Sequence, residues 1–286
     1  MTSLPGNQEA IEAWNTILFD KFLGYRPLVT TALGIHGTRA MDRLAPKAGS
    51  SVVDIGCGFG DTTQQLGERV GKTGKAVGVD AAENFIKAAR REAEHMPQVS
   101  FEVADVEASV PGGPYDYAFS RMGTMFFNSP VFALRNVRKV LVPGGVFYMV
   151  VWRKKEANEG FYNSELVVRE ILGDPPKGDN VTCGPGPFSM ASADVVSDQV
   201  LAAGFASVSF ERSDADILIG NTVDDAIDFS LALGPAGEVV RLAGDEAVKR
   251  QAEIKAGLTK LIEPYKRGDG VYAPSSCWLI RAQAPR

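Results

Sequence analysis

From residue 51 to residue 152, short β-branched runs alternate with amphipathic stretches long enough to be helices, and this rhythm constrains the fold most. The β-branched runs are SVVDI, KAVGVD, VSFEVAD, YDYAFS and GVFYMVVW. Strands that alternate with helices in this way make right-handed crossovers and a parallel sheet with helices on both faces. The sequence therefore predicts an α/β fold built on a doubly wound, mostly parallel sheet.

Helical additions flank this core. The segment before residue 50 has apolar residues at helical spacing, and further helices are expected over 161–172, 194–203 and 246–265 and from Thr222, where Thr222-x-x-Asp225 has the pattern of a capping box. A glycine- and proline-rich loop over 173–187 and extended runs over 206–212 and 276–282 complete the pattern. We expect one domain over 1–286, whose parts are a cap (1–50), a cofactor-binding core (51–152), additions that form a substrate lid (153–190 and 221–268) and segments that complete the sheet (191–220 and 269–286).

Composition excludes several classes of protein. Thirty basic and 35 acidic residues give a net charge of −5, which argues against a nucleic-acid partner. No apolar run reaches the roughly 20 residues needed to span a bilayer, and the first residues lack the pattern of a secretory signal. The three cysteines (Cys57, Cys183 and Cys277) have no metal-binding spacing, so we expect no metal, no disulfide framework and a cytoplasmic location.

The segment Asp54-Ile55-Gly56-Cys57-Gly58-Phe59-Gly60 carries the most chemical information. An apolar strand leads here into a glycine-rich turn that opens a helix, and glycine allows backbone to approach a ligand closely. Dinucleotide-binding proteins use G-x-G-x-x-G at this place, whereas the spacing here is G-x-G-x-G. A carboxylate at Asp54 suits a cationic ligand such as an α-amino group, and it would repel a diphosphate.

Two further acids end the next strands of the predicted sheet. Asp80 ends KAVGVD and can accept hydrogen bonds from a ribose diol, which fits a nicotinamide cofactor as well as any other adenosine-containing ligand. Asp105 ends VSFEVAD and can accept a hydrogen bond from the adenine amine. Ligands bind at the carboxyl edge of such sheets, so Asp54, Asp80 and Asp105 together predict one crevice.

The ordered segments VVDIGCGFG, VGVDAAENFIKAAR, FEVADVE, YDYAFSRMGTMFF and VRKVLVPGGVFYMVVW resemble the motifs of class I S-adenosylmethionine-dependent methyltransferases. The resemblance is closest to the bacterial small-molecule group similar to ubiquinone/menaquinone biosynthesis methyltransferases. It is strong over about 50–152 and weaker over the helical additions. It implies a Rossmann-like sheet of seven strands, the last of them antiparallel.

The resemblance also implies a set of cofactor contacts. The turn would wrap the methionine part of S-adenosylmethionine, Asp80 would hold the ribose, Ala81 would line the adenine pocket, and Ser120 and Arg121 would lie beside the methionine part and the transferred methyl group. The turn residues are Asp54, Gly56, Cys57, Gly58 and Gly60, and the adenine edge would be framed by Ala104, Asp105 and Val106. The product would be S-adenosylhomocysteine.

Methyl transfer needs little acid–base chemistry, so candidates for the acceptor side are few. His36 in the cap is a candidate base, against the alternative of a structural histidine. Tyr25 is a candidate acceptor contact. Met122 and Phe126 follow strand four and suggest an apolar acceptor pocket, against the alternative of core packing.

The leading interpretation is methyl transfer to a small apolar or aromatic molecule, with oxygen favoured as the target atom and nitrogen or carbon open. One alternative is an NAD(P)-dependent oxidoreductase, which the turn spacing and Asp54 disfavour. Another is a catalytically inactive cofactor-binding scaffold or regulatory protein. An apolar face on the cap could support a homodimer.

Overall fold

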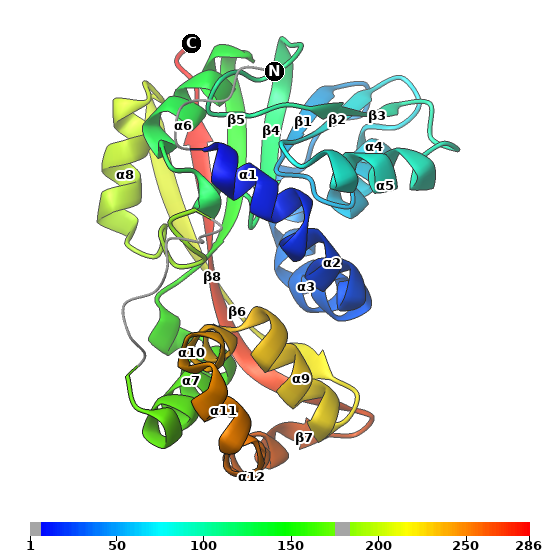
Figure 1. The fold of residues 1–286 in the computed structure, drawn as a ribbon. Coiled ribbons are helices and arrows are strands. Elements are labelled where there is room, and N and C mark those ends of the chain that lie inside the picture. The colour runs from blue at the N-terminus through cyan, green and yellow to red at the C-terminus, as the bar shows by residue number, and fades with distance from the viewer. Residues whose placement is uncertain (1–6, 175–183) are drawn as a thin grey trace.

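The computed structural model, which describes residues 7–174 and 184–286, is organised around one twisted sheet with helices on both sides (Figure 1). The strand order is β3-β2-β1-β4-β5-β8-β6, and the short β7 pairs with β8. Strands β1 to β5 are parallel, whereas β8 is antiparallel to both of its neighbours. The predicted mostly parallel sheet with an antiparallel last strand is confirmed. The strands are β1 (Ser51–Ile55), β2 (Lys75–Asp80), β3 (Val99–Val103), β4 (Tyr115–Arg121), β5 (Leu141–Trp152), β6 (Ser207–Gly220), β7 (Lys266–Arg267) and β8 (Gly270–Gln283).

The helices form three groups. Helices α1 (Gln8–Asn15), α2 (Ile17–Gly24) and α3 (Arg26–Leu44) precede the sheet, as predicted. Helices α4 (Asp61–Val70), α5 (Glu83–Glu92), α6 (Pro130–Lys139) and α8 (Ala193–Ala202) flank the sheet. The third group consists of α7 (Glu159–Leu172), α9 (Val223–Leu233), α10 (Pro235–Ala243), α11 (Asp245–Lys249) and α12 (Gln251–Ile262). Three 3₁₀ turns are η1 (Thr124–Phe126), η2 (Lys155–Ala157) and η3 (Glu263–Tyr265).

Strands β6 and β8 are longer than predicted. They pair with each other from Ser207 and Gln283 to Gly220 and Val271, whereas β5 pairs with β8 only as far as Cys277. Beyond β5, the two strands continue as a ribbon towards the third group of helices (Figure 1). Asp214 and Asp216 lie in this ribbon and are exposed, so it lacks the continuous apolar run by which the central strands were predicted.

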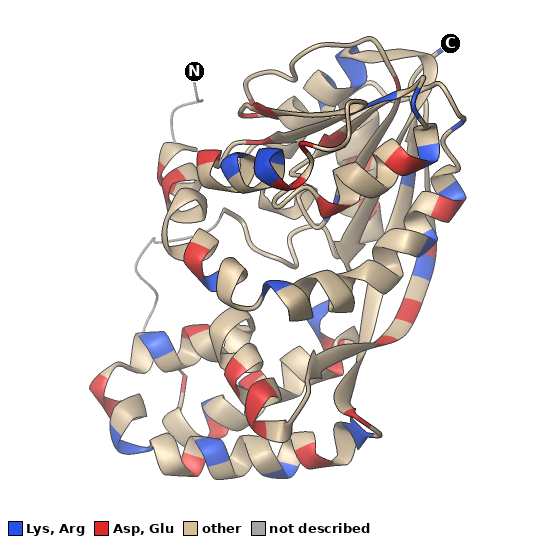
Figure 2. Ribbon diagram, turned by 90° about the vertical axis from the view of Figure 1, so that its right-hand side faces the viewer, with Lys and Arg blue, Asp and Glu red and all other residues tan. Residues whose placement is uncertain are grey.

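The third group of helices, which we call the helical body, packs around the ends of β6 and β8 (Figure 1). Helix α10 packs on α7 and α9, and α12 packs on the same two helices. On the side shown in Figure 2, acidic and basic residues are interspersed along these helices. Within the described ranges, no helix combines the length and the apolar character that crossing a membrane requires.

Two helix starts differ in how they are capped. Thr222 and Asp225 form the predicted capping box at the start of α9. At α6, Pro130 occupies the first helical position, but the Ser129 side chain makes no capping hydrogen bond. The buried Glu107 carboxylate instead accepts hydrogen bonds from the backbone N–H groups of Asn128 and Ser129, each at 2.8 Å. Part of the predicted loop over 173–187 lies outside the described residues.

Candidate functional site

The turn between β1 and α4 lies against the tip of β4. Gly56 and Gly60 have φ values of +68° and +79°, in the left-handed region that favours glycine. A Cβ atom on Gly56 would lie 2.9 Å from the Cα of Gly123, and one on Gly60 would lie 2.6 Å from the Phe101 ring. The predicted turn therefore depends on glycine at both positions, and it brings its backbone against the segment that follows β4.

Asp54 is almost completely buried at the end of β1. Its Oδ2 accepts hydrogen bonds from the hydroxyls of Thr62 (2.6 Å) and Thr63 (2.7 Å), while its Oδ1 is buried and has no partner. Burial raises the pKa of Asp54 to about 6, although the two hydroxyls and the charge of Arg121 act in the opposite direction. The unpartnered Oδ1 would therefore form a strong hydrogen bond with a cationic donor.

Asp80 ties the glycine turn to the start of α5. Its Oδ2 accepts a hydrogen bond from the Gly58 N–H and its Oδ1 accepts one from the Ala82 N–H, both at 2.9 Å. Burial raises the pKa of Asp80, and these backbone donors oppose the shift. Each carboxylate oxygen can accept more than one hydrogen bond, so Asp80 keeps capacity for a diol.

Asp105 stands at the far end of the same edge. Its Oδ1 accepts a hydrogen bond from the Glu107 N–H at 2.9 Å, whereas its Oδ2 is buried without a partner. The N–H of Ala104 donates to the carbonyl of Asp80 at 2.9 Å, which joins the ends of β2 and β3. The structure thus brings the three predicted acids to one edge and leaves buried acceptor atoms on Asp54 and Asp105.

Ser120 and Arg121 at the end of β4 have different environments. The Ser120 hydroxyl donates to the carbonyl of Ile55 at 2.7 Å and holds β4 to β1. Arg121 forms an ion pair with Asp61 at 2.8 Å, and its Nε is buried without a partner. A Cβ atom on Gly37 would lie 3.0 Å from Cδ of Arg121, so α3 packs directly on this side chain.

An aromatic cluster joins α1 and α2 to the glycine turn and the start of α5, and it consists of Trp14, Phe19, Phe59, Phe85 and Phe126. The Phe59 and Phe85 rings are 4.7 Å apart, Phe19 lies 5.1 Å from Phe85, and Trp14 lies 4.8 Å from Phe126. Helices α1 and α2 therefore cover the turn and the start of α5 as a lid.

Polar contacts fasten the same lid. The Asn84 backbone N–H donates to Asn15 Oδ1 at 2.9 Å, and its side chain donates to the Asn15 carbonyl at 2.7 Å. Arg26 forms an ion pair with Glu92 and lies over the Phe59 ring at 4.4 Å. Asn15 thus fastens the lid to the start of α5, and Arg26, at the start of α3, binds the end of α5.

His36 is completely buried between α3 and the β6–β8 ribbon. Its Nδ1 lies 2.9 Å from the Ser213 hydroxyl and its Nε2 lies 2.9 Å from the Ser275 hydroxyl. Burial, with a smaller effect of Arg39, lowers the pKa of His36 to about 4. Both ring nitrogens are engaged within the protein, and this geometry favours the structural interpretation that the sequence left open beside the catalytic one.

A second row of rings, which we call the aromatic wall, connects the tip of β5 to the helical body. Trp152 lies 5.8 Å from Phe161, Phe161 lies 6.5 Å from Phe229, and Phe229 lies 5.8 Å from Tyr25. Burial, then the charges of Asp228 and Asp225, raise the pKa of Tyr25. Sequence reasoning missed Trp152, Phe161 and Phe229, although a tryptophan at the end of strand five was a visible signal.

The other two acceptor candidates lie apart from Tyr25. Phe126 belongs to the aromatic cluster under the lid, whereas Tyr25 belongs to the aromatic wall. Met122 is buried and has a φ of +61°, and its N–H donates to the carbonyl of Val150 at 2.9 Å. The structure therefore divides these candidates between the cofactor side and the helical-body side of the β4 tip.

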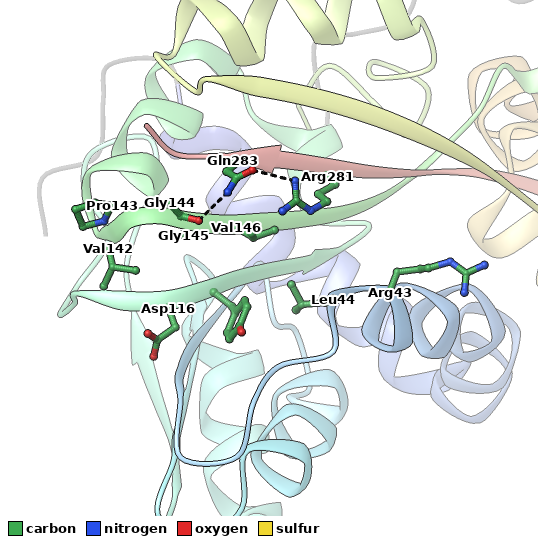
Figure 3. Close-up of a pocket in the computed structure, with 11 residues that line it drawn as sticks. Arg43, Leu44, Asp116, Val142, Pro143, Gly144, Gly145, Val146, Arg281 and Gln283 are labelled. Carbon is green, nitrogen blue, oxygen red and sulfur yellow. Dashed lines mark hydrogen bonds between the residues drawn. The ribbon is translucent and has the colours of Figure 1, made fainter. Parts of the chain in front are cut away.

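A cavity of about 450 Å³ lies at the opposite edge of the sheet, where β4 and β5 begin (Figure 3). Asp116, Arg281 and Gln283 line it. The Gln283 side chain accepts a hydrogen bond from Arg281 and donates one to the Gly144 carbonyl, as the dashed lines show. Parallel sheets bind ligands at their carboxyl edge, so this cavity is separate from the predicted crevice.

The cysteines and the acids show no metal chemistry in the part of the chain that the structure describes. Cys57 and Cys277 are free, buried thiols, and burial raises the pKa of each well above the usual value. Cys183 lies outside the described residues. Over 7–174 and 184–286, no three His, Cys, Asp or Glu side chains are grouped so that they could hold a metal ion.

Comparison with known proteins identifies the domain that builds this edge. Residues 52–145 match the family described as a methyltransferase domain. The chain is 36% identical over 119 residues to the 2-phytyl-1,4-naphtoquinone methyltransferase of Thermosynechococcus vestitus, a match that covers 40% of this chain and 52% of that protein. It is 29% identical over 109 residues to the demethylmenaquinone methyltransferase of Staphylococcus carnosus, covering 38% of this chain and 45% of that protein. The chain thus spans about half the length of these relatives.

A solved structure extends the fold comparison to most of the chain. The YcgJ protein of Bacillus subtilis superimposes with a TM-score of 0.56 and 17% identity, over 88% of this chain and 99% of that one. At this identity the likeness shows the fold alone. Both relatives named here are called methyltransferases.

Proposed function

Residues 52–145 match a family described as a methyltransferase domain, and from this match we propose that the protein transfers a methyl group from S-adenosylmethionine to a small aromatic acceptor. The observation that carries the proposal is the pair of buried carboxylate oxygens without partners, Oδ1 of Asp54 and Oδ2 of Asp105. They lie at the ends of β1 and β3, on either side of β2. Their chemistry matches a cationic α-amino group at one end of a ligand and an adenine amine at the other.

The residues of the edge fit the cofactor part by part. Asp54 would hold the α-amino group, and Arg121, whose buried Nε has no partner, would hold the carboxylate. Asp80 would hold the ribose hydroxyls. The backbone of Gly56, Cys57, Gly58 and Gly60 would follow the methionine part, and Ala81, Ala104 and Val106 would enclose the adenine.

When bound, S-adenosylmethionine would supply an activated methyl group. The bond between this group and sulfur would break as the acceptor forms the new bond, its electron pair would stay on the sulfur, and a hydroxyl acceptor would release its proton to solvent. The chain itself needs to align the acceptor and exclude water. The lid of α1 and α2 excludes water on the cofactor side, and Met122 and Trp152 border the acceptor side. We propose a structural role in the cap for His36, because both of its ring nitrogens are hydrogen-bonded within the protein.

The acceptor would lie along the aromatic wall. Aromatic side chains stack favourably on flat rings, and the wall begins at the tip of β5, beside the β4 tip where Arg121 and Met122 lie. Two relatives are named for quinone substrates, which supports a ring-shaped acceptor here. We favour oxygen as the target atom and a substrate lid formed from 153–190 and 221–268 within a single domain.

A methyl-transfer assay tests the proposal. The protein would be incubated with S-adenosylmethionine carrying a tritiated methyl group and, in parallel, with a phenol, a hydroquinone and an aliphatic amine series. We expect label in the extracted phenol or hydroquinone product and none in the amines. Label in none of the three series, with S-adenosylhomocysteine bound normally, would favour an inactive cofactor-binding scaffold.

We also propose a location and an oligomeric state for the enzyme. We propose that it is cytoplasmic and that its acceptor is a small molecule. Ile17, Leu23 and Ile35 are exposed apolar residues on α1–α3, and they support a homodimer formed through the cap. Light scattering at micromolar concentration tests the dimer, and a monomeric mass would exclude it.

A further inference from the structure

Seven buried side-chain N or O atoms have no hydrogen-bond partner among the described residues. Four of them are at the carboxyl edge or directly after β4, on Asp54, Asp105, Arg121 and Thr124. The proposed cofactor contacts use the first three. The hydroxyl of Thr124 remains, and neither the domain match nor the sequence analysis gives it a role.

Thr124 lies between the cofactor turn and the aromatic wall. The preceding residue, Gly123, packs so closely on the turn that a Cβ atom on it would lie 2.8 Å from the Ile55 carbonyl oxygen. The sulfur of the following residue, Met125, accepts a hydrogen bond from the backbone N–H of Trp152 at 3.4 Å. Thr124 itself is 1% exposed. Its hydroxyl is therefore enclosed at the point where the cofactor side and the acceptor side meet.

An enclosed hydroxyl without a partner is unfavourable, because the group has lost its hydrogen bonds to water and gained none. Threonine in a helical turn commonly bonds to a carbonyl of the preceding turn, as Thr259 does here with Lys255. Thr124 makes no such bond. The unpartnered Thr124 hydroxyl destabilises the ligand-free protein. A ligand that hydrogen-bonds to this hydroxyl would remove that destabilisation.

The chemistry of that partner follows from the hydroxyl and its neighbours. A threonine hydroxyl is uncharged and can donate one hydrogen bond and accept others. Met122, two residues before Thr124, and Trp152, whose backbone N–H bonds to the residue after Thr124, are apolar and buried. This combination suits one oxygen atom on an otherwise apolar, flat molecule.

We propose that the Thr124 hydroxyl hydrogen-bonds the ring oxygen of a hydroxylated aromatic acceptor, so that Thr124 determines acceptor specificity and orientation. This inference rests on the proposed methyltransferase function. It makes Thr124 a binding residue and assigns no proton transfer to it.

The test measures binding of 1-naphthol and of 1-methylnaphthalene, in which a methyl group replaces the hydroxyl, to protein saturated with S-adenosylhomocysteine. Thr124→Val replaces the hydroxyl with a methyl group at nearly constant volume. We expect it to weaken 1-naphthol about tenfold, the loss of roughly one hydrogen bond. Binding of 1-methylnaphthalene and of S-adenosylhomocysteine should stay within about twofold. Thr124→Ser keeps the hydroxyl and should restore binding of 1-naphthol.

Thermal unfolding supplies a second readout. Thr124→Val should raise the melting temperature of the ligand-free protein, because it removes an unpartnered hydroxyl. The matched control is Tyr115→Phe at the start of β4, away from the carboxyl edge, which removes a hydroxyl that donates to the Pro111 carbonyl at 2.9 Å. It should lower the melting temperature and leave 1-naphthol binding unchanged.

Each contrary outcome has a distinct meaning. Equal 1-naphthol affinity in the wild type and Thr124→Val, or no 1-naphthol binding by the loaded wild type, overturns the inference. Loss of S-adenosylhomocysteine affinity in Thr124→Val also overturns it, because the hydroxyl would then serve the cofactor. Failure of the wild type to bind S-adenosylhomocysteine would instead overturn the proposed function.

Discussion

Asp54 and His36 are both buried titratable residues, yet their environments shift stability with pH in opposite directions. The pKa of Asp54 is raised to about 6, so the folded protein binds more protons than the unfolded chain between about pH 4 and 6, and stability falls as pH rises through this window. The pKa of His36 is lowered to about 4, so the unfolded chain binds more protons between about pH 4 and 6.5, and stability rises with pH there. The two contributions oppose each other.

Asp54→Asn should separate the effect of this carboxylate on stability from its effect on cofactor affinity. At pH 7 the variant loses a buried charge, so the ligand-free protein should become more stable. It should bind S-adenosylhomocysteine at least about tenfold more weakly, because the cationic amine loses its counter-charge. Wild-type affinity should also fall as pH drops below about 6, since the carboxylate becomes protonated, whereas the variant should show no such trend.

Calorimetric titration between pH 5 and 8 measures these effects. Asp116→Asn is the matched control, because the Asp116 carboxylate is also hydrogen-bonded, accepting from the Ser51 backbone N–H at 2.8 Å, but lies at the opposite edge of the sheet. It should leave the affinity unchanged. Equal affinities for the wild type and Asp54→Asn at pH 7.5 would exclude an interaction between Asp54 and the amine.

His36→Ala tests the structural assignment of the histidine. The variant removes a fully buried ring and its hydrogen bonds to Ser213 and Ser275, which should cost about 3 kcal/mol of unfolding free energy. The two hydroxyls keep their other partners, Arg39 and the Ala215 carbonyl. Turnover per folded molecule should change by no more than about threefold. Urea unfolding and a steady-state assay measure both, and a large loss of turnover without a loss of stability would restore the catalytic interpretation.

The three acids could be predicted from sequence because each one ends a strand of a regular βα repeat, where position along the chain determines position at the edge. His36 could not be resolved in the same way. Its partners, Ser213 and Ser275, are 177 and 239 residues away along the chain, so only the tertiary structure decides between a base and a structural residue. Glu107 was missed for a similar reason, since its carboxylate caps α6 from another loop.

At the scale of elements, the helices before the sheet act on the site as a lid. Trp14 packs on Phe126 and on Phe22, and Asn15 is hydrogen-bonded to Asn84. Trp14→Ala should weaken this packing, so that S-adenosylhomocysteine dissociates faster and the amides of residues 8–24 exchange faster with solvent.

Stopped-flow displacement and hydrogen exchange measure these two effects. Ile17→Ala is the control, because Ile17 lies on the same helix pair but is 61% exposed. It should change neither the dissociation rate nor the exchange. An unchanged dissociation rate in Trp14→Ala would mean that the lid does not retain the cofactor.

The sequence predicted the existence of the elements better than their ends. Helices α1 to α3 and the strands of the core follow from apolar periodicity, which reflects burial on one or both faces. The continuation of β6 and β8 past β5 was missed, because exposed Asp214 and Asp216 interrupt the apolar pattern. That ribbon is stabilised by pairing between two distant segments and by packing of α3 and α9 on β6, and neither leaves a local signal.

On the scale of the whole molecule, the β6–β8 ribbon connects the sheet to the helical body, and the aromatic wall runs from the tip of β5 over α7 and α9 to Tyr25. Phe229 lies on α9 and touches Tyr25 of the cap and Phe161 of α7. Phe229→Ala should therefore raise the acceptor KM severalfold and leave the affinity for S-adenosylhomocysteine unchanged. Val248→Ala, at an exposed position of the same body, should change neither, and a weaker cofactor affinity in Phe229→Ala would contradict this division of labour.

The central claim is that the carboxyl edge of this sheet binds S-adenosylmethionine rather than a nicotinamide dinucleotide. Calorimetric titration of the whole chain with S-adenosylhomocysteine and, separately, with NADH tests it most directly. The account predicts one site of micromolar affinity for S-adenosylhomocysteine and no heat of binding with NADH. Micromolar binding of NADH without binding of S-adenosylhomocysteine would contradict it.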